Sequence, residues 1–243
     1  MKKLFFTLFV MIACCFGGLL KAQNKMNSSS KYLEKTQQSI VSISALTATG
    51  DIEKLSIELN NGLDAGLTIN EIKEVLVHLY AYCGFPRSLN GISTFTTVVQ
   101  ERKTRGISDV EGRVAKLNTG SEGSYERGRK VLETLTKTPQ TRPAPGFGEF
   151  APRIDTFLKQ HLFADIFDSD ILTFQQRELA TVSALAAMSG VASQLQAHIG
   201  MAINTGLTQS QLLDSFAIID QKISEDQGDL ARAVLKKVVD TKK

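Results

Sequence analysis

The side chains best suited to chemistry in this sequence are a histidine and a glutamate that stand twenty positions apart. His198 can accept or donate a proton near neutral pH, and it lies on a predicted helix beside the apolar residues Leu195 and Ile199. Glu178 lies at the start of the preceding predicted helix, where a carboxylate could pair with the imidazole. A simpler interpretation exists for each: a core histidine bound to a backbone carbonyl, and an acid favoured by the helix dipole.

An internal repeat supplies the elements that must position these side chains. Gly66-Leu67-Thr68 recurs as Gly206-Leu207-Thr208, 140 residues later, and apolar positions on both sides of the tripeptide match at the same offset. Each copy predicts a helix, a tight turn and a second helix. The glycine can end the first helix in a left-handed conformation, and the threonine can cap the second. A further helix precedes each copy, at about residues 34–48 and 174–188.

The two copies differ at the positions that could do chemistry. Ser39 stands where the second copy has Glu178, and Glu58 stands in the place of His198. The first copy has His78 instead, where the second has Ile218. The first copy has therefore either lost its site or supplies different groups, and His78 with Glu58 is a possible additional site. A core histidine is the simpler interpretation of His78.

The rest of the chain contains loops and helices. Residues 104–147 are rich in Gly, Ser, Thr and Pro and predict a linker with one short helix at Tyr125–Thr136. Ile154–Phe167 predicts an amphipathic helix or two short ones. Since no extended alternation of apolar and polar residues occurs, we predict an all-α fold. We interpret Cys83 as a small buried residue and His161 as a residue of a helix surface.

The N-terminus has the pattern of a secretory signal peptide. Two lysines precede an apolar run over residues 4–20, and Ala22 stands before a polar stretch. We therefore expect residues 1–22 to be removed, leaving a periplasmic or secreted protein without a membrane anchor. An uncleaved anchor is the alternative. A lipoprotein is less favoured, because Met11 and Ile12 make a poor lipobox before the cysteine pair.

Loss of residues 1–22 changes what charge and cysteine content imply. The segment holds three lysines and no acids, so the formal charge falls from +3 to zero, which removes the electrostatic argument for a nucleic-acid partner. Cys83 becomes the only cysteine, and neither an internal disulfide nor a Cys-x-x-Cys pair can form. No two histidines have metal-ligand spacing and no phosphate-binding glycine loop occurs, so we expect no metal and no cofactor.

Several stretches resemble the carboxymuconolactone decarboxylase family and its relatives with the alkyl hydroperoxidase D fold. The resemblance covers residues 31–103 and 148–243, which we take as two tandem repeats, and it is closest to exported members with two copies. The stretches that carry it are Ala65–Leu76, Tyr80–Pro86 with Asn90, Phe163–Phe167, Arg177–Ala180, Gln196–His198 and Asn204–Thr208. In such proteins Tyr80–Pro86 would belong to the closing helix of the first copy.

The resemblance implies one of two chemistries. In one branch, two cysteines seven and four residues before the histidine form a thiol relay with it and a glutamate. Here those positions hold Val191 and Gln194, so a dithiol mechanism is chemically unavailable. The other branch decarboxylates a γ-lactone carboxylic acid by acid–base chemistry without a cofactor. The resemblance makes His198 the working histidine and Glu178 its proton-relay partner, within about 6 Å of each other.

We therefore predict cofactor-free chemistry on a small carboxylated lactone or a related carbonyl compound, with carboxy-lyase activity if the protein is an enzyme. A thiol-dependent antioxidant that uses Cys83 and a non-catalytic helical binding scaffold are the alternatives. Single-copy relatives resemble hexamers built as trimers of dimers, so a tandem chain is expected to form a homotrimer. The helix Leu76–Tyr82, apolar nearly all round, is compatible with such burial.

Overall fold

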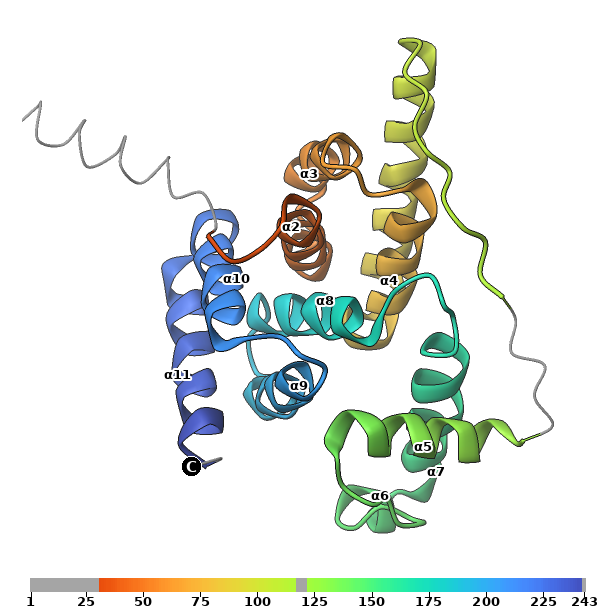
Figure 1. The fold of residues 1–243 in the computed structure, drawn as a ribbon, viewed down its shortest axis with the longest axis vertical. Helices are drawn as coiled ribbons and strands as arrows, with labels where there is room; N and C mark the ends of the chain where they lie inside the picture. Colours follow the sequence, from red (N-terminus) through yellow and green to blue (C-terminus); the bar gives the residue numbers. More distant parts are fainter. Residues whose placement is uncertain (1–30, 117–121, 242–243) are drawn as a thin grey trace, which may run out of the picture. The chain divides into compact units, whose positions relative to one another are not determined.

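The computed structural model of the chain describes residues 31–116 and 122–241. Within these ranges all regular structure is helical, which confirms the predicted all-α class (Figure 1). Residues Tyr32–Lys243 form one compact unit. In chain order the helices are α2 (Lys35–Thr49), α3 (Ile52–Asp64), α4 (Ile69–Thr104), α5 (Ser124–Thr136), α6 (Phe147–Phe150), α7 (Pro152–Phe157), the π-helix η1 (Leu158–Ile166), α8 (Phe174–Ala186), α9 (Ala192–Asn204), α10 (Gln209–Lys222) and α11 (Glu225–Thr241).

The expected leader at residues 1–22 lies outside the described residues. Among the residues that are described, no helix is both long enough and apolar enough to cross a membrane.

The two repeats are α2–α3–α4 and α8–α9–α10, and they share the predicted turn. Gly66 and Gly206 adopt left-handed φ values of 102° and 101°. The hydroxyls of Thr68 and Thr208 each accept a hydrogen bond, 3.2 Å long, from the backbone N–H three residues later. The side chain of that third residue accepts in return from the threonine N–H, which completes a capping box in both copies. The turn chemistry predicted from the sequence is therefore confirmed.

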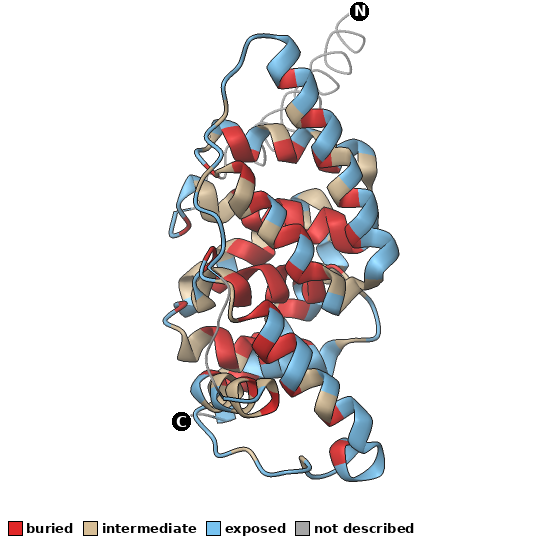
Figure 2. Ribbon diagram, turned by 90° about the vertical axis from the view of Figure 1, so that its right-hand side faces the viewer, coloured by how far each residue is buried: buried red, intermediate tan, exposed pale blue. Residues whose placement is uncertain are grey.

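The first helices of the two repeats pack against each other at the centre of the unit. Ten consecutive residues are buried in each helix, 39–48 in α2 and 177–186 in α8. Buried residues accordingly concentrate in the middle layer of helices (Figure 2). A helix that is buried all round brings its polar side chains into the core, where each needs a partner. Glu178 and Arg177 are two such side chains on α8.

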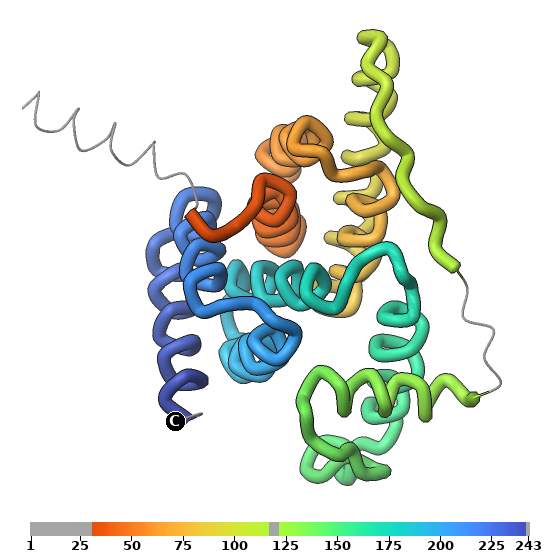
Figure 3. The backbone as a smooth tube through the Cα atoms, viewed as in Figure 1, coloured from red at the N-terminus to blue at the C-terminus, as the bar shows by residue number. Residues whose placement is uncertain are grey.

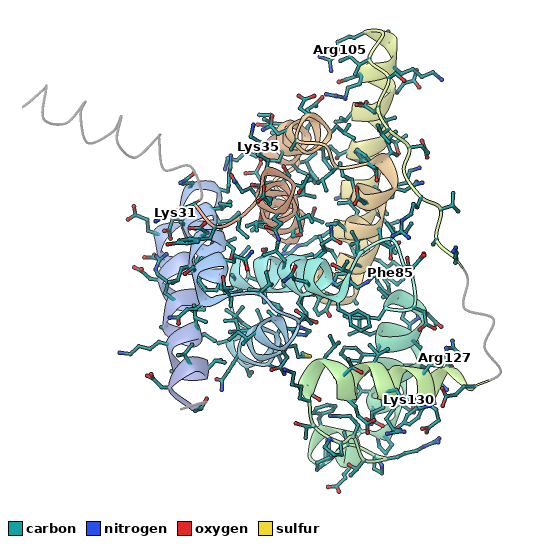
Figure 4. All side chains as sticks on the ribbon, viewed as in Figure 1. Lys31, Lys35, Phe85, Arg105, Arg127 and Lys130 are labelled. Atoms are coloured by element: carbon teal, nitrogen blue, oxygen red, sulfur yellow. The ribbon has the colours of Figure 1, made fainter. Side chains whose placement is uncertain are left out.

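Helix α4 reverses direction at Gly84, which has φ 82° and ψ 159°. The Ser88 hydroxyl donates to the Leu76 carbonyl over 2.8 Å, although a straight helix would separate these residues by about 18 Å. The second half of α4 therefore runs back along the first and ends at Thr104, next to Arg105, which is labelled with Phe85 in Figure 4. Gly84 therefore divides the stretch Tyr80–Pro86, which resembles the closing helix of the family, between the two halves of α4.

The segment between the repeats is partly tied to α4 and partly folded into a separate layer. The backbone N–H of Ile69 donates to the carbonyl of Val110 (2.9 Å), so the chain after α4 returns along its first turn (Figure 3). Further on, α5 crosses η1 so closely that a Cβ on Gly128 would lie 1.6 Å from the carbonyl oxygen of Lys159. Together with Phe167, which follows η1, and Met201 of α9, these helices build a second apolar cluster that contains Leu135, Leu162, Phe163 and Ile166.

Candidate active site

The structure brings His198 and Glu178 into direct contact. The Nδ1 atom of His198 lies 2.8 Å from the Oε2 atom of Glu178. Glu178, on α8, is completely buried, whereas His198, on α9, retains 7% of its surface. The small exposed surface of the pair therefore belongs to the histidine. This separation is well inside the expected 6 Å; the catalytic role of the pair stays a prediction.

The simpler interpretations of both residues do not hold. Helix α8 begins at Phe174 and has no acid in its first turn, so Glu178 lies beyond the reach of a stabilising helix dipole. His198 is bound to a carboxylate and not to a backbone carbonyl. With Nδ1–H donated to Glu178, the Nε2 atom is the one left to exchange a proton with a ligand.

Tyr82 is a member of the site that the sequence did not reveal. Its ring packs edge-on against the His198 ring, with 5.2 Å between centroids. Burial, and then the charge of Glu178, raise the pKa of Tyr82 well above its ordinary value, and the Thr181 hydroxyl offsets only part of this rise. The tyrosine therefore stays neutral. The available signal was its position one turn after His78, on the same face of a helix.

His78 also lies beside this site, although it belongs to the first repeat. Its ring is 5.2 Å from that of Tyr82, and its Nε2 atom lies 2.8 Å from the Thr181 hydroxyl. Its Nδ1 atom faces Nη1 of the fully buried Arg177, at 3.5 Å. Burial, and then the Arg177 charge, lower the pKa of His78 well below 6.5, so the ring is neutral. Arg177 itself is paired with Glu74 at 2.7 Å.

The first repeat has no counterpart of the His198–Glu178 pair. Ser39 donates its hydroxyl to the Lys35 carbonyl one turn back in its own helix (3.1 Å). Glu58 binds the ammonium group of Lys222, from α10, at 2.8 Å. His78 and Glu58 thus engage different partners, and the described structure does not join them into a second site.

The remaining candidates are not placed for the alternative chemistries. The Cys83 thiol donates to the Leu79 carbonyl, and burial raises its pKa to about 11, so it is a poor nucleophile. His161 is exposed and pairs with Asp165 at 3.0 Å, one turn along η1. Within residues 31–116 and 122–241, no group of three potential ligands is arranged to hold a metal ion.

These features define a class of all-α proteins with a duplicated three-helix unit and a buried carboxylate–imidazole pair in the second copy. The model of the carboxymuconolactone decarboxylase family matches residues 19–95 and 152–221, together more than half of the chain. The chain belongs to this family and contains two tandem copies of its unit. The resemblance to this family, with two tandem copies, is confirmed, whereas the likeness to exported members stays a prediction. A comparison with curated proteins finds no match.

Proposed function

We propose that this protein is a cofactor-free acid–base enzyme that acts on a small carboxylated lactone or a related carbonyl compound. The observation that carries the proposal is the 2.8 Å contact between His198 Nδ1 and Glu178 Oε2. A fully buried carboxylate fixes the orientation of the imidazole and balances the positive charge that it gains on protonation. Membership of the decarboxylase family supports the class of substrate.

Decarboxylation of such a substrate requires one proton transfer, which the pair can supply. When the bond between the ring carbon and the carboxylate breaks, CO₂ leaves and the electron pair spreads into the lactone carbonyl. The protonated Nε2 of His198 then delivers its proton to the carbon, and the ring regains a proton from solvent. Glu178 keeps Nδ1–H in place throughout, so the same tautomer is restored after each turnover.

The test measures CO₂ release from carboxymuconolactone and related carboxylated lactones. We expect His198→Gln to lower kcat about 100- to 10,000-fold, because it removes the proton donor, and Glu178→Gln to lower it by a smaller factor. Glu58→Gln is the matched control, since Glu58 occupies the place of His198 in the first repeat. Equal rates for the wild type and His198→Gln would overturn the proposal. Binding of these lactones without turnover would identify the protein as a binding scaffold.

We also propose that the protein is exported and that it assembles as a homotrimer. The leader-like residues 1–22 support export. Incomplete burial of α4 supports a homotrimer, because Val77, Phe85 and Leu89 are 42%, 62% and 55% exposed. N-terminal sequencing of the mature protein and light scattering test the two proposals, and an uncleaved chain or a monomer would contradict them.

A further inference from the structure

Two buried polar atoms next to His198 lack hydrogen-bond partners, and they are complementary. The Oε1 atom of Glu178 is a buried acceptor without a donor. The hydroxyl of Tyr82 is buried, and its proton likewise has no acceptor within hydrogen-bond distance. Buried polar groups in native proteins are nearly always paired, directly or through water. A phenol that can donate and a carboxylate that can only accept satisfy each other.

The surroundings of Tyr82 place its hydroxyl in the same cluster as the carboxylate. Its ring lies against His198, the partner of the other Glu178 oxygen. The charge of Glu178 is also one of the two influences that raise the pKa of Tyr82. Since burial and this charge keep the phenol protonated, its proton is available for donation to the carboxylate.

The Tyr82 oxygen can also accept a hydrogen bond, at the end of a series of donors that begins at Arg177. A guanidinium group can only donate, so His78 Nδ1, 3.5 Å from Arg177, must accept. The proton of His78 therefore resides on Nε2 and is donated to the Thr181 hydroxyl over 2.8 Å. Thr181 can then direct its own proton to the Tyr82 oxygen. His78, Thr181 and Tyr82 thus each accept on one side and donate on the other.

We infer that Tyr82 is a positioning residue, whose hydroxyl donates to Oε1 of Glu178 through one bridging water molecule, since the two atoms do not bond directly. Glu178 is then held at both oxygens, by Tyr82 on one side and by His198 on the other. Arg177 sets the direction of the hydrogen bonds, which run from Arg177 through His78 and Thr181 to Tyr82. The carboxylate is thereby fixed in one rotamer, and part of its charge is shared with the phenol instead of the imidazole.

This arrangement makes the site a joint product of both repeats. Tyr82 and His78 come from the first repeat, whereas the Glu178–His198 pair comes from the second. The catalytic consequence rests on the proposed function, but the hydrogen bond itself can be tested without a substrate. A failure of one proposal is therefore distinguishable from a failure of the other.

The test is an NMR titration of the imidazole rings, of which the chain has three. We expect Tyr82→Phe to raise the titration midpoint of His198 by about one pH unit, because the less stabilised carboxylate holds the imidazolium proton more tightly. Thr181→Val should raise it less, since it removes only the donor behind Tyr82. Tyr80→Phe, on the same helix, is the control and should leave the midpoint unchanged.

The ionisable groups shown to act on this cluster are few, so the shift can be interpreted. Glu178 and Arg177 belong to α8, and Tyr82 and His78 belong to α4. Helices α5 and α11 also pack against α9, and their buried faces include the apolar residues Leu135, Ala231, Val234, Leu235 and Val238. Tyr125, the ionisable residue buried on α5, is bound to Asp155 and Lys159.

An unchanged His198 midpoint in a folded Tyr82→Phe variant would show that the phenol is not the donor. If that variant does not fold, Thr181→Val is the deciding test. A raised His198 midpoint in it supports the series of hydrogen bonds that ends at Glu178, and an unchanged midpoint overturns the proposal. Rescue by Thr181→Ser, which restores a hydroxyl, separates the hydrogen bond from a packing effect.

Discussion

The two repeats share a backbone plan and differ in what their buried polar side chains do. In the second repeat, Glu178 and His198 bind each other. In the first, Ser39 bonds to its own helix and Glu58 forms an ion pair. The comparison shows that turn and capping signals, which are local, survive duplication, while a pair that depends on two distant positions is lost when either one changes.

The third helix of each repeat, α4 or α10, contributes a side chain that contacts the other repeat. Tyr82 on α4 and Lys222 on α10 occupy matching positions, 140 residues apart. Tyr82 packs on His198 of the second repeat, and Lys222 binds Glu58 of the first at 2.8 Å. The molecule therefore has two pseudo-equivalent places where a third helix closes the other repeat, and only one of them contains a candidate site. One contains an acid–base pair beneath a phenol, and the other is closed by an ion pair.

The largest difference in stability between matching positions of the two repeats is expected at Arg177, whose counterpart in the first repeat is Gln38. We expect Arg177→Gln to lower the free energy of unfolding by roughly 3–5 kcal/mol, because it leaves Glu74 without its buried partner. Gln38→Ala should cost only about 1 kcal/mol, since Gln38 donates a single hydrogen bond to the Leu33 carbonyl. Urea unfolding measures both losses. Equal losses would show that the buried arginine is not specific to the second repeat.

The difference between His78 and Ile218 predicts a pH dependence of stability. The folded protein holds the His78 pKa well below its unfolded value of 6.5, so the unfolded chain binds this proton more readily. Stability is therefore complete above about pH 6.5 and falls as the pH drops below it, by up to about 1.4 kcal/mol per pH unit. Replacing the histidine with the residue of the second repeat, His78→Ile, should flatten the decline between about pH 6.5 and 5.

Unfolding curves at several pH values test this prediction, with Thr181→Val as the control that keeps the ring and removes its partner. A slope that is the same in His78→Ile and the wild type would contradict the assignment of His78 as a neutral buried base.

The smallest expected effect lies where the repeats agree. Gly66→Ala and Gly206→Ala should each cost about 1–2 kcal/mol, because both glycines have left-handed φ values that an L side chain adopts poorly. An added Cβ meets nothing within 4 Å at Gly66, and at Gly206 only the Gln175 amide at 3.4 Å. The two changes in Tm should therefore be nearly equal. A marked inequality would mean that the turns are held by different contacts.

The sequence predicted those parts of the molecule that depend on neighbouring residues. The helix class, the two glycine turns and the threonine caps follow from signals within a few positions of one another. The pairing of Glu178 with His198 could also be predicted, because both lie on consecutive helices of one repeat.

The rest of the site depends on contacts between repeats, and a single sequence has no local signal for them. His78 and Thr181 are 103 positions apart, and their contact exists because α4 packs against α8. The reversal of α4, by contrast, has local signals in the sequence, which helix periodicity alone does not reveal. Tyr80–Cys83 is helical, and the break comes at Gly84, where the left-handed φ is available to glycine and the following Pro86 adds a second signal.

The second apolar cluster, to which α5 and η1 contribute, covers one route by which a ligand could approach the fully buried Glu178. Tyr82 packs against both this cluster and the larger core. The α5–η1 layer is small enough to open as a local unit, while α2 and α8 unfold only with the whole protein. We expect its amides to exchange with deuterium well before those of α8. Opening of this layer would uncover Tyr82, which packs between the two clusters, and would give a ligand a route toward the His198–Glu178 pair.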